Sequence, residues 1–104
     1  LERRDNYCGG IYKVAPPVVN MCAPPGQWQT YDMTFRAPRF DQDGEKTGNA
    51  RVTVVHNGTT IHDEIELPQP TGGALDAQVT QPGGIYLQDH RDRVQYRNIW
   101  LLEL

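Results

Sequence analysis

The chain of 104 residues lacks the features that mark several common functional classes. It contains no apolar run approaching the ~18 residues that a membrane-spanning helix needs, so we expect no membrane-spanning segment. Its 10 Lys and Arg residues are scattered and are outnumbered by 13 Asp and Glu, which gives a net charge of −3. Without a basic patch, nucleic acid is not an expected partner.

Cysteine is scarce, since only Cys8 and Cys22 are present. Two cysteines are too few for a four-thiolate zinc site, and neither belongs to a CxxC pair. A disulfide between them would close a loop of about 15 residues and contribute ~3 kcal/mol through the chain entropy of the unfolded state. Cys8 and Cys22 are therefore candidates for a disulfide, and two unrelated buried thiols are the alternative.

Long uninterrupted segments are also missing, because 8 Pro and 10 Gly residues punctuate the chain. Few of the gaps between them can hold a three-turn helix, and none has the i, i+3, i+4 apolar repeat. The gaps hold short β-branched and aromatic segments such as residues 28–36, where Tyr31, Met33 and Phe35 alternate with polar residues. The sequence predicts an all-β fold of antiparallel strands and long Pro/Gly loops, and it predicts one buried and one solvated face for residues 28–36.

The clearest local signal is a hairpin over residues 51–63. Its centre is Asn57-Gly58, the residue pair typical of a two-residue type I′ turn. Regular alternation on either side of this turn places His56 on the same face as Ile61 and places His62 on the opposite face. We therefore expect His56 at the hairpin tip and His62 on a solvated face, with no metal ion shared between the two.

The most polar candidates lie near the C-terminus. Residues 84–104 have the pattern of two strands around a short polar turn. The first strand presents Gln88 and His90 on one face, and the second carries Arg97. Trp100, in the second strand, is expected to pack in the core or at a sheet edge.

Short motifs along the chain occur in the order found in one family. They comprise residues 8–12, 24–32, 36–41, 50–58, 70–73, 87–90 and 96–100. Together they resemble the 3-keto-disaccharide hydrolase domain from Tyr7 onward. The resemblance implies a concanavalin-like jelly-roll sandwich, of which this chain would be the C-terminal portion.

The resemblance also bears on domain organisation. Residues 1–104 correspond to the C-terminal half of the family's domain, so we expect a single partial domain. The start at Leu1, without Met, also suggests a fragment. We expect the missing N-terminal half, or another chain, to be needed to complete the fold. The family usually has Gly after residues 87–90; with Arg91 there, either the turn differs or a non-Gly residue is strained.

The function that the resemblance implies is cleavage of glycosides already oxidised to the ketone at C3. The ketone acidifies the C2 proton, so elimination of the aglycone followed by hydration can replace direct displacement. This route needs a base, a group that polarises the ketone and an acid for the leaving oxygen. A divalent metal ion is left open as the polarising group, and no other cofactor is expected. The alternative is a non-catalytic carbohydrate-binding or interaction module.

The resemblance also assigns candidate roles to individual residues. His90 is the candidate base or metal ligand because imidazole titrates near neutrality, with a structural histidine as the alternative. Gln88 is a candidate to hydrogen-bond sugar hydroxyls. Tyr12 would stack on or hydrogen-bond a sugar, and Arg97 would polarise an oxygen or orient a carboxylate, unless the two only complete the sheet packing. Trp28 is expected in core or edge packing. A carbohydrate is the expected partner, and the expected location is periplasmic or secreted.

Overall fold

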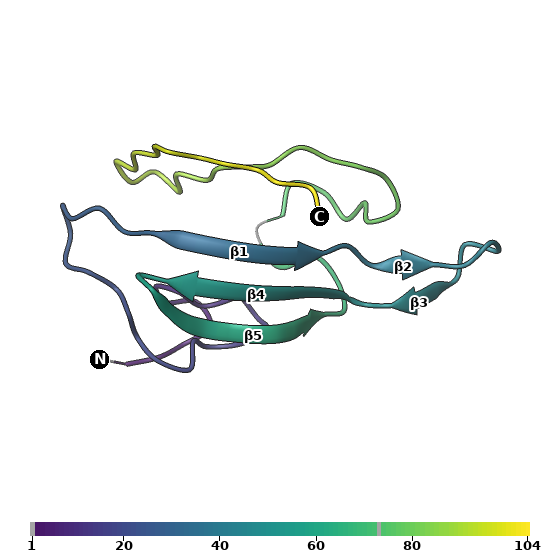
Figure 1. The fold of residues 1–104 in the computed structure, drawn as a ribbon, viewed down its shortest axis with the longest axis horizontal. Helices are drawn as coiled ribbons and strands as arrows, with labels where there is room; N and C mark the ends of the chain where they lie inside the picture. Colours follow the sequence, from purple (N-terminus) through teal and green to yellow (C-terminus); the bar gives the residue numbers. More distant parts are fainter. Residues whose placement is uncertain (1, 73) are drawn as a thin grey trace.

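The computed structural model describes residues 2–72 and 74–104, and this part of the chain is all-β (Figure 1). Its strands are β1 (Tyr31–Arg36), β2 (Arg39–Phe40), β3 (Lys46–Gly48), β4 (Ala50–His56) and β5 (Thr59–Leu67). The antiparallel all-β prediction is confirmed, since β1, β4 and β5 form one antiparallel sheet with β4 in the middle and β2 pairs with β3. Among the described residues, the structure contains no helix able to cross a membrane.

The hairpin between β4 and β5 has the expected turn. Asn57 and Gly58 have φ values of 49° and 84°, positive at both positions as a type I′ turn requires. The Asn57 side chain has a second function, because its Oδ1 accepts from the N–H of Thr30 at 2.9 Å and its Nδ2 donates to the carbonyl of Met21 at 2.7 Å. The turn thereby also holds the chain that leads into β1.

A bulge in β5 changes which side chains are buried. The strand has nine residues opposite the seven of β4. Val55 pairs with Thr60 but Val54 pairs with His62, which leaves Ile61 as an extra residue. Ile61 and His62 are therefore both buried, at 0% and 1% exposure. The expectation of a solvated His62 is wrong because the bulge interrupts the alternation on which it rested.

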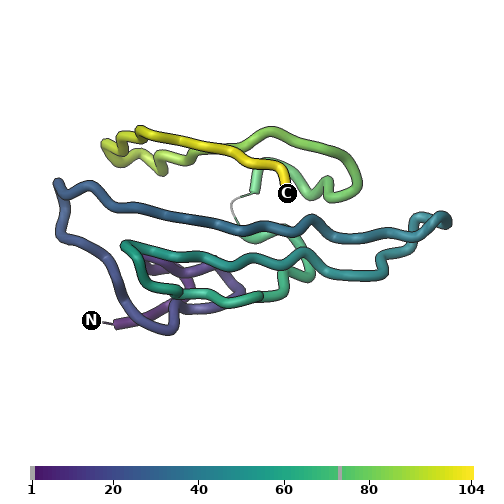
Figure 2. The backbone as a smooth tube through the Cα atoms, viewed as in Figure 1, coloured from purple at the N-terminus to yellow at the C-terminus, as the bar shows by residue number. Residues whose placement is uncertain are grey.

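A small hydrophobic core lies against β4 and β5. Its buried members are Val52, Val54 and Ile61, and Ile11, Met21, Ile65 and Leu67 pack against them. Two of these partly buried residues come from the N-terminal segment, which we define as residues 2–30. This segment contains no strand, lies against β4 and β5 in Figure 2, and donates from the N–H of Val18 to the carbonyl of Ile61 at 3.0 Å.

The side chains of β1 on the core side of the sheet remain open to solvent. Tyr31, Met33 and Phe35 pair directly with buried residues of β4 and so share their face. They are nevertheless 46%, 64% and 61% exposed. The expected buried face of residues 28–36 is wrong for this chain, because the N-terminal segment covers the β4 and β5 part of the sheet face and leaves β1 uncovered.

The C-terminal segment, residues 74–104, forms no strand among its described residues. It runs along the β1 side of the sheet (Figure 2, green to yellow), and every residue from 80 to 104 is exposed. The predicted strands at residues 84–104 are wrong because no cross-strand ladder forms and Asn98, with a φ of 54°, interrupts the second extended run. Trp100 is 89% exposed, so the expectation that it packs is also wrong.

The turn expected within this segment is present despite the missing ladder. The N–H of Asp92 donates to the carbonyl of Asp89 at 2.8 Å. The two central residues, His90 and Arg91, have φ values of 45° and 70°. Arg91 therefore adopts the left-handed backbone conformation that suits the glycine usual in the family, and it carries the strain anticipated there.

Candidate functional site

The four side chains expected to form a sugar site lie in separate places. Tyr12 belongs to the N-terminal segment and borders a hollow beside residues 68–72, whereas Arg97 lies over Trp28. Gln88 lies just before the C-terminal turn, and His90 is one of the two central residues of that turn. Within the described residues no hydrogen bond or ion pair joins these four side chains to one another. A single site built from all four remains a prediction.

A hollow beside Tyr12 is a candidate site for a sugar. It has a volume of about 250 Å³ and is lined by Tyr12, Lys13, Val14, Pro68, Gln69, Pro70, Thr71 and Gly72. The Tyr12 side chain is 44% exposed, and the Nζ of Lys13 lies 5.5 Å from the ring centroid. An aromatic face bordered by an ammonium, an amide and a hydroxyl can stack on a sugar ring and hydrogen-bond its hydroxyls.

Backbone contacts fix the position of Tyr12. Ile11 donates to the carbonyl of Ala15 at 2.9 Å, and the N–H of Lys13, at a φ of 61°, donates to Asp5 Oδ2 at 2.7 Å. On the other side, Gly72 lies directly against the ring. A Cβ on Gly72 would lie 2.5 Å from Tyr12 Cδ1 and Cε1, a separation that no side chain can adopt without displacing the ring.

Arg97 makes a contact that sequence spacing does not reveal. Its guanidinium carbon lies 3.9 Å from the ring centroid of Trp28, a cation–π arrangement worth about 0.5–1 kcal/mol at exposed sites. Trp28 is 51% exposed, so of the two expected positions, core or edge, the core is excluded. Arg97 donates no hydrogen bond to another described residue, which leaves its N–H groups available to an oxygen of a substrate.

His90 occupies a central position of the exposed turn. The hydroxyl of Tyr96 donates to the carbonyl of Gln88 and braces the chain just before that turn. The side-chain amide of Gln88 makes no hydrogen bond to the other described residues. Both side chains are thus open to an incoming ligand, and no hydrogen bond or ion pair from another described residue fixes the orientation of the imidazole.

The buried environment of His56 is the polar site that sequence reasoning missed. The side chain is 1% exposed, and its Nε2 lies 2.8 Å from Gln29 Oε1. The same oxygen accepts from the N–H of Ala23 at 3.0 Å, which identifies it as the amide oxygen. Because an amide oxygen only accepts, His56 Nε2 carries the ring proton and Nδ1 has a free lone pair. The shared parity of His56 with the apolar residues of β4 was the signal available for its burial.

Tyr31 covers the imidazole of His56. The two rings are stacked at a centroid distance of 4.2 Å and an interplanar angle of 9°. Burial lowers the pKa of His56 and raises the pKa of the Tyr31 hydroxyl, because in each case the charged form loses hydration. In both cases burial favours the neutral form of the side chain.

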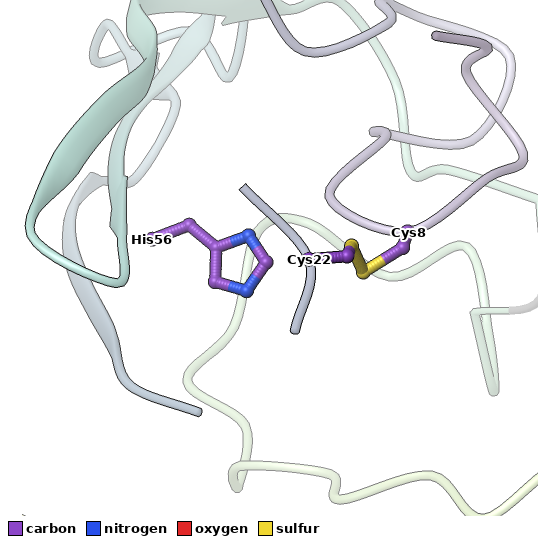
Figure 3. Close-up of side chains that lie close together, drawn as sticks. All are labelled: Cys8, Cys22 and His56. Atoms are coloured by element: carbon purple, nitrogen blue, oxygen red, sulfur yellow. A yellow bond between two sulfur atoms is a disulfide. The ribbon is translucent and has the colours of Figure 1, made fainter. Parts of the chain in front are cut away.

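Cys8 and Cys22 lie beside the imidazole of His56 (Figure 3). They are joined as a disulfide with a Cα–Cα distance of 6.3 Å. The ligand atoms of Cys8, Cys22 and His56 all lie within 4.8 Å of one another. Within residues 2–72 and 74–104, this is the one group of three or more His, Cys, Asp or Glu side chains close enough to hold an ion. His90 does not belong to it.

Comparison with known proteins gave two matches. The profile described as the 3-keto-alpha-glucoside-1,2-lyase-like domain matches residues 2–102. A crystal structure of a proposed glycosyl hydrolase from Parabacteroides distasonis ATCC 8503 is similar with a TM-score of 0.62 and 32% sequence identity, over 76% of this chain and 34% of that chain. The chain thus spans about a third of the length of that protein. No curated protein matches the sequence.

Proposed function

The chain belongs to the 3-keto-alpha-glucoside-1,2-lyase-like domain family, and on that premise we propose that it forms part of an enzyme domain that cleaves 3-keto-glycosides. The match over residues 2–102 confirms the family inferred from the motifs. The likeness to a proposed glycosyl hydrolase supports a glycoside-related activity. The 3-keto specificity is the finer part of the proposal.

The observation that carries this proposal is the hollow beside Tyr12. An exposed aromatic ring forms one wall, and Lys13, Gln69 and Thr71 supply hydrogen-bonding groups around it. Sugars are bound in this way because their C–H faces pack on aromatic rings while their hydroxyls pair with polar side chains. Gly72 lies close to the ring, and a Cβ at this position would lie 2.5 Å from Tyr12 Cδ1 and Cε1.

We propose that His90 acts as the base in this reaction. Its imidazole would take the C2 proton, the C–H electron pair would form the C1–C2 double bond, and the C1–O bond to the aglycone would break as the leaving oxygen takes a proton from water. Water would then add to the C1–C2 double bond. The free N–H groups of Arg97 are suited to hydrogen-bond the ketone oxygen as negative charge develops on it.

The residues around His90 do not fit the divalent ion that the family resemblance left open. His90 lies outside the group of potential ligands, so the residues that the structure describes supply too few donors at that position. The steps above therefore use no metal ion. An ion at this position would need ligands from elsewhere in a larger domain.

The test is turnover of a 3-keto-glucoside by the full-length protein, followed as release of the aglycone. His90→Gln is expected to lower kcat by about 10²–10⁴-fold, the usual contribution of a general base. Arg93→Gln, an exposed substitution next to the same turn, is the matched control and should retain the wild-type rate. Equal rates for the two variants would contradict the assignment of His90.

A non-catalytic carbohydrate-binding module is the second candidate. It is favoured by one observation, which is that the Tyr12 hollow and His90 lie in separate segments with no contact between them. This function predicts saturable sugar binding that Tyr12→Ala abolishes, together with no turnover of the 3-keto substrate.

We also propose an exported location, because a disulfide persists in oxidising compartments.

A further inference from the structure

We propose that Cys8, Cys22 and His56 form a binding site for a thiophilic divalent cation such as Zn²⁺ when the disulfide is reduced, and that the disulfide closes this site. The proposal concerns a place separate from the Tyr12 hollow and from His90, so it does not depend on the glycosidase function. Two thiolates and one imidazole are ligands that zinc prefers in proteins. They leave one position of a tetrahedral site for water.

The positions of the ligand atoms suit such a site. All three lie within 4.8 Å of one another (Figure 3). A tetrahedral zinc centre with Zn–S bonds of about 2.3 Å separates its sulfur atoms by about 3.8 Å. The reduced sulfurs of Cys8 and Cys22 reach this separation by rotating about their side-chain bonds, because the Cα atoms are already 6.3 Å apart.

The imidazole of His56 is oriented as a metal ligand. Gln29 Oε1 accepts the proton of Nε2, so the free lone pair is on Nδ1. A Cβ built on Gly9 lies 3.7 Å from His56 Nδ1, which places this nitrogen beside the chain that directly follows Cys8. An acceptor on the distal ring nitrogen is the usual outer support of a metal-binding histidine.

The two faces of the cluster differ in access. His56 is buried and stacked on Tyr31, so it forms the fixed part of the site. Cys8 is exposed and Cys22 is half-buried, so a reductant and an ion can both reach the sulfurs from solvent. The cluster thus combines one rigid ligand, His56, with two sulfur ligands that reduction of the disulfide sets free.

The redox step balances with a dithiol as the reductant. The dithiol gives two electrons and two protons to the S–S bond and becomes a disulfide, while Cys8 and Cys22 become thiols. Binding of the cation then releases the two thiol protons to solvent. Two thiolates and a neutral imidazole leave no net charge around a divalent ion, which favours M²⁺ over a monovalent metal in this half-buried place.

Cobalt titration of the full chain tests the proposal directly. The protein is reduced with a phosphine under anaerobic conditions, freed of reductant and titrated with Co²⁺. The expected result is thiolate-to-cobalt charge-transfer absorption that saturates at one equivalent and disappears when Zn²⁺ is added. The oxidised protein should show no such absorption. Absence of the absorption from the reduced wild-type chain would overturn the proposal.

Variants distinguish this site from a pair of adventitious thiols. Cys8→Ser and His56→Gln are each expected to weaken binding tenfold or more, whereas His90→Gln, outside the cluster, should bind as the wild type does. Gln29→Leu removes the support of the imidazole and is expected to weaken binding by about 10–100-fold, with recovery in Gln29→Glu. Unchanged affinity in His56→Gln would show a dithiol site without histidine and would contradict the proposal.

A measurement on the wild-type chain avoids the risk that a variant fails to fold. In ¹⁵N NMR spectra of the reduced protein, Zn²⁺ should shift the Nδ1 resonance of His56 while Nε2 keeps its proton. His62, the other buried histidine, should be unaffected at its protonated Nε2. A His56 Nδ1 resonance that does not move on addition of Zn²⁺ would contradict the assignment.

Discussion

The Nε2 of His62 lies 2.6 Å from the carbonyl oxygen of Gly9, a residue 53 positions earlier in the chain. Because a carbonyl oxygen only accepts, His62 donates in this hydrogen bond. The side chain is 1% exposed, so the contact is shielded from water. It attaches the N-terminal segment to β5 at the place where the bulge at Ile61 turns His62 inward.

Replacement of His62 by Leu should be strongly destabilising. The carbonyl of Gly9 would lose its partner in a part-buried hydrogen bond, and an unsatisfied buried polar group costs about 1–3 kcal/mol. The measurement is the free energy of unfolding from urea titration. Asp63→Asn, an exposed change at the next position, is the control and should stay within about 0.5 kcal/mol of wild type. Equal losses in the two variants would show that this hydrogen bond does not stabilise the fold.

The stability of the oxidised chain should depend on the protonation of His56. Burial lowers the pKa of His56 from its ordinary value of 6.5, so the folded state binds fewer protons than the unfolded state. The free energy of unfolding should therefore be highest above pH 6.5 and should fall as the pH is lowered through 6.5 towards the folded-state pKa. Urea titrations on both sides of this pH measure the effect. His56→Gln should flatten this part of the profile, and an unchanged profile would contradict the prediction.

The open stripe on β1 should contribute little to the stability of this chain. Phe35→Thr removes a side chain that is 61% exposed, so a change within about 0.5 kcal/mol is expected. Val54→Ala, on the same face but 6% exposed, should cost about 2 kcal/mol. Light scattering should show less self-association for Phe35→Thr, because an apolar edge strand is open to pairing. A cost for Phe35→Thr equal to that of Val54→Ala would mean that β1 is covered.

Gly72→Ala should disturb the sugar hollow while leaving the sheet intact. The new Cβ would lie 2.5 Å from the Tyr12 ring and must displace it. We expect sugar affinity measured by calorimetry to fall about tenfold or more, since the ring provides one wall of the hollow. Gly83→Ala is the control, because a Cβ at Gly83 meets nothing within 4 Å. Wild-type affinity in Gly72→Ala would remove Tyr12 from the site.

Arg91→Gly should relax the C-terminal turn. Arg91 has a φ of 70°, which costs a non-glycine residue about 1–2 kcal/mol, and glycine adopts this conformation freely. After the entropy that glycine loses, a local gain of about 0.5–1 kcal/mol is expected. Amide exchange at Asp92, whose N–H closes the turn, should slow a few-fold. Arg93→Gly, outside the two positive-φ positions, should give no such slowing; an equal effect in both variants would refute the strain at Arg91.

Local patterns predicted the parts of this fold that local chemistry decides. The Asn57-Gly58 turn follows from two residues that tolerate positive φ, and the exclusion of helices follows from the spacing of Pro and Gly. The burial of His62 could not be read in the same way. It depends on the unpaired Ile61, and a bulge is a property of how two strands fit together.

The candidate site was likewise predictable in part from local sequence and in part only from tertiary contacts. Tyr12 could be named from its motif, but its position in a hollow depends on the contact with Gly72, 60 residues later. The prediction of two C-terminal strands was wrong for a related reason. Residues 84–104 have strand-like alternation, yet a strand exists only when a partner accepts its hydrogen bonds, and none does so among the described residues.

By itself the sequence determined the all-β class, the type I′ turn and the family, because these follow from residue types and their order along the chain. The tertiary structure alone decided that His56 lies beside Cys8 and Cys22, with its free nitrogen set by Gln29. Those groups come from distant segments. Only the packing of the N-terminal segment on β4 and β5 brings them together, because burying the small apolar core there also buries the imidazole among them.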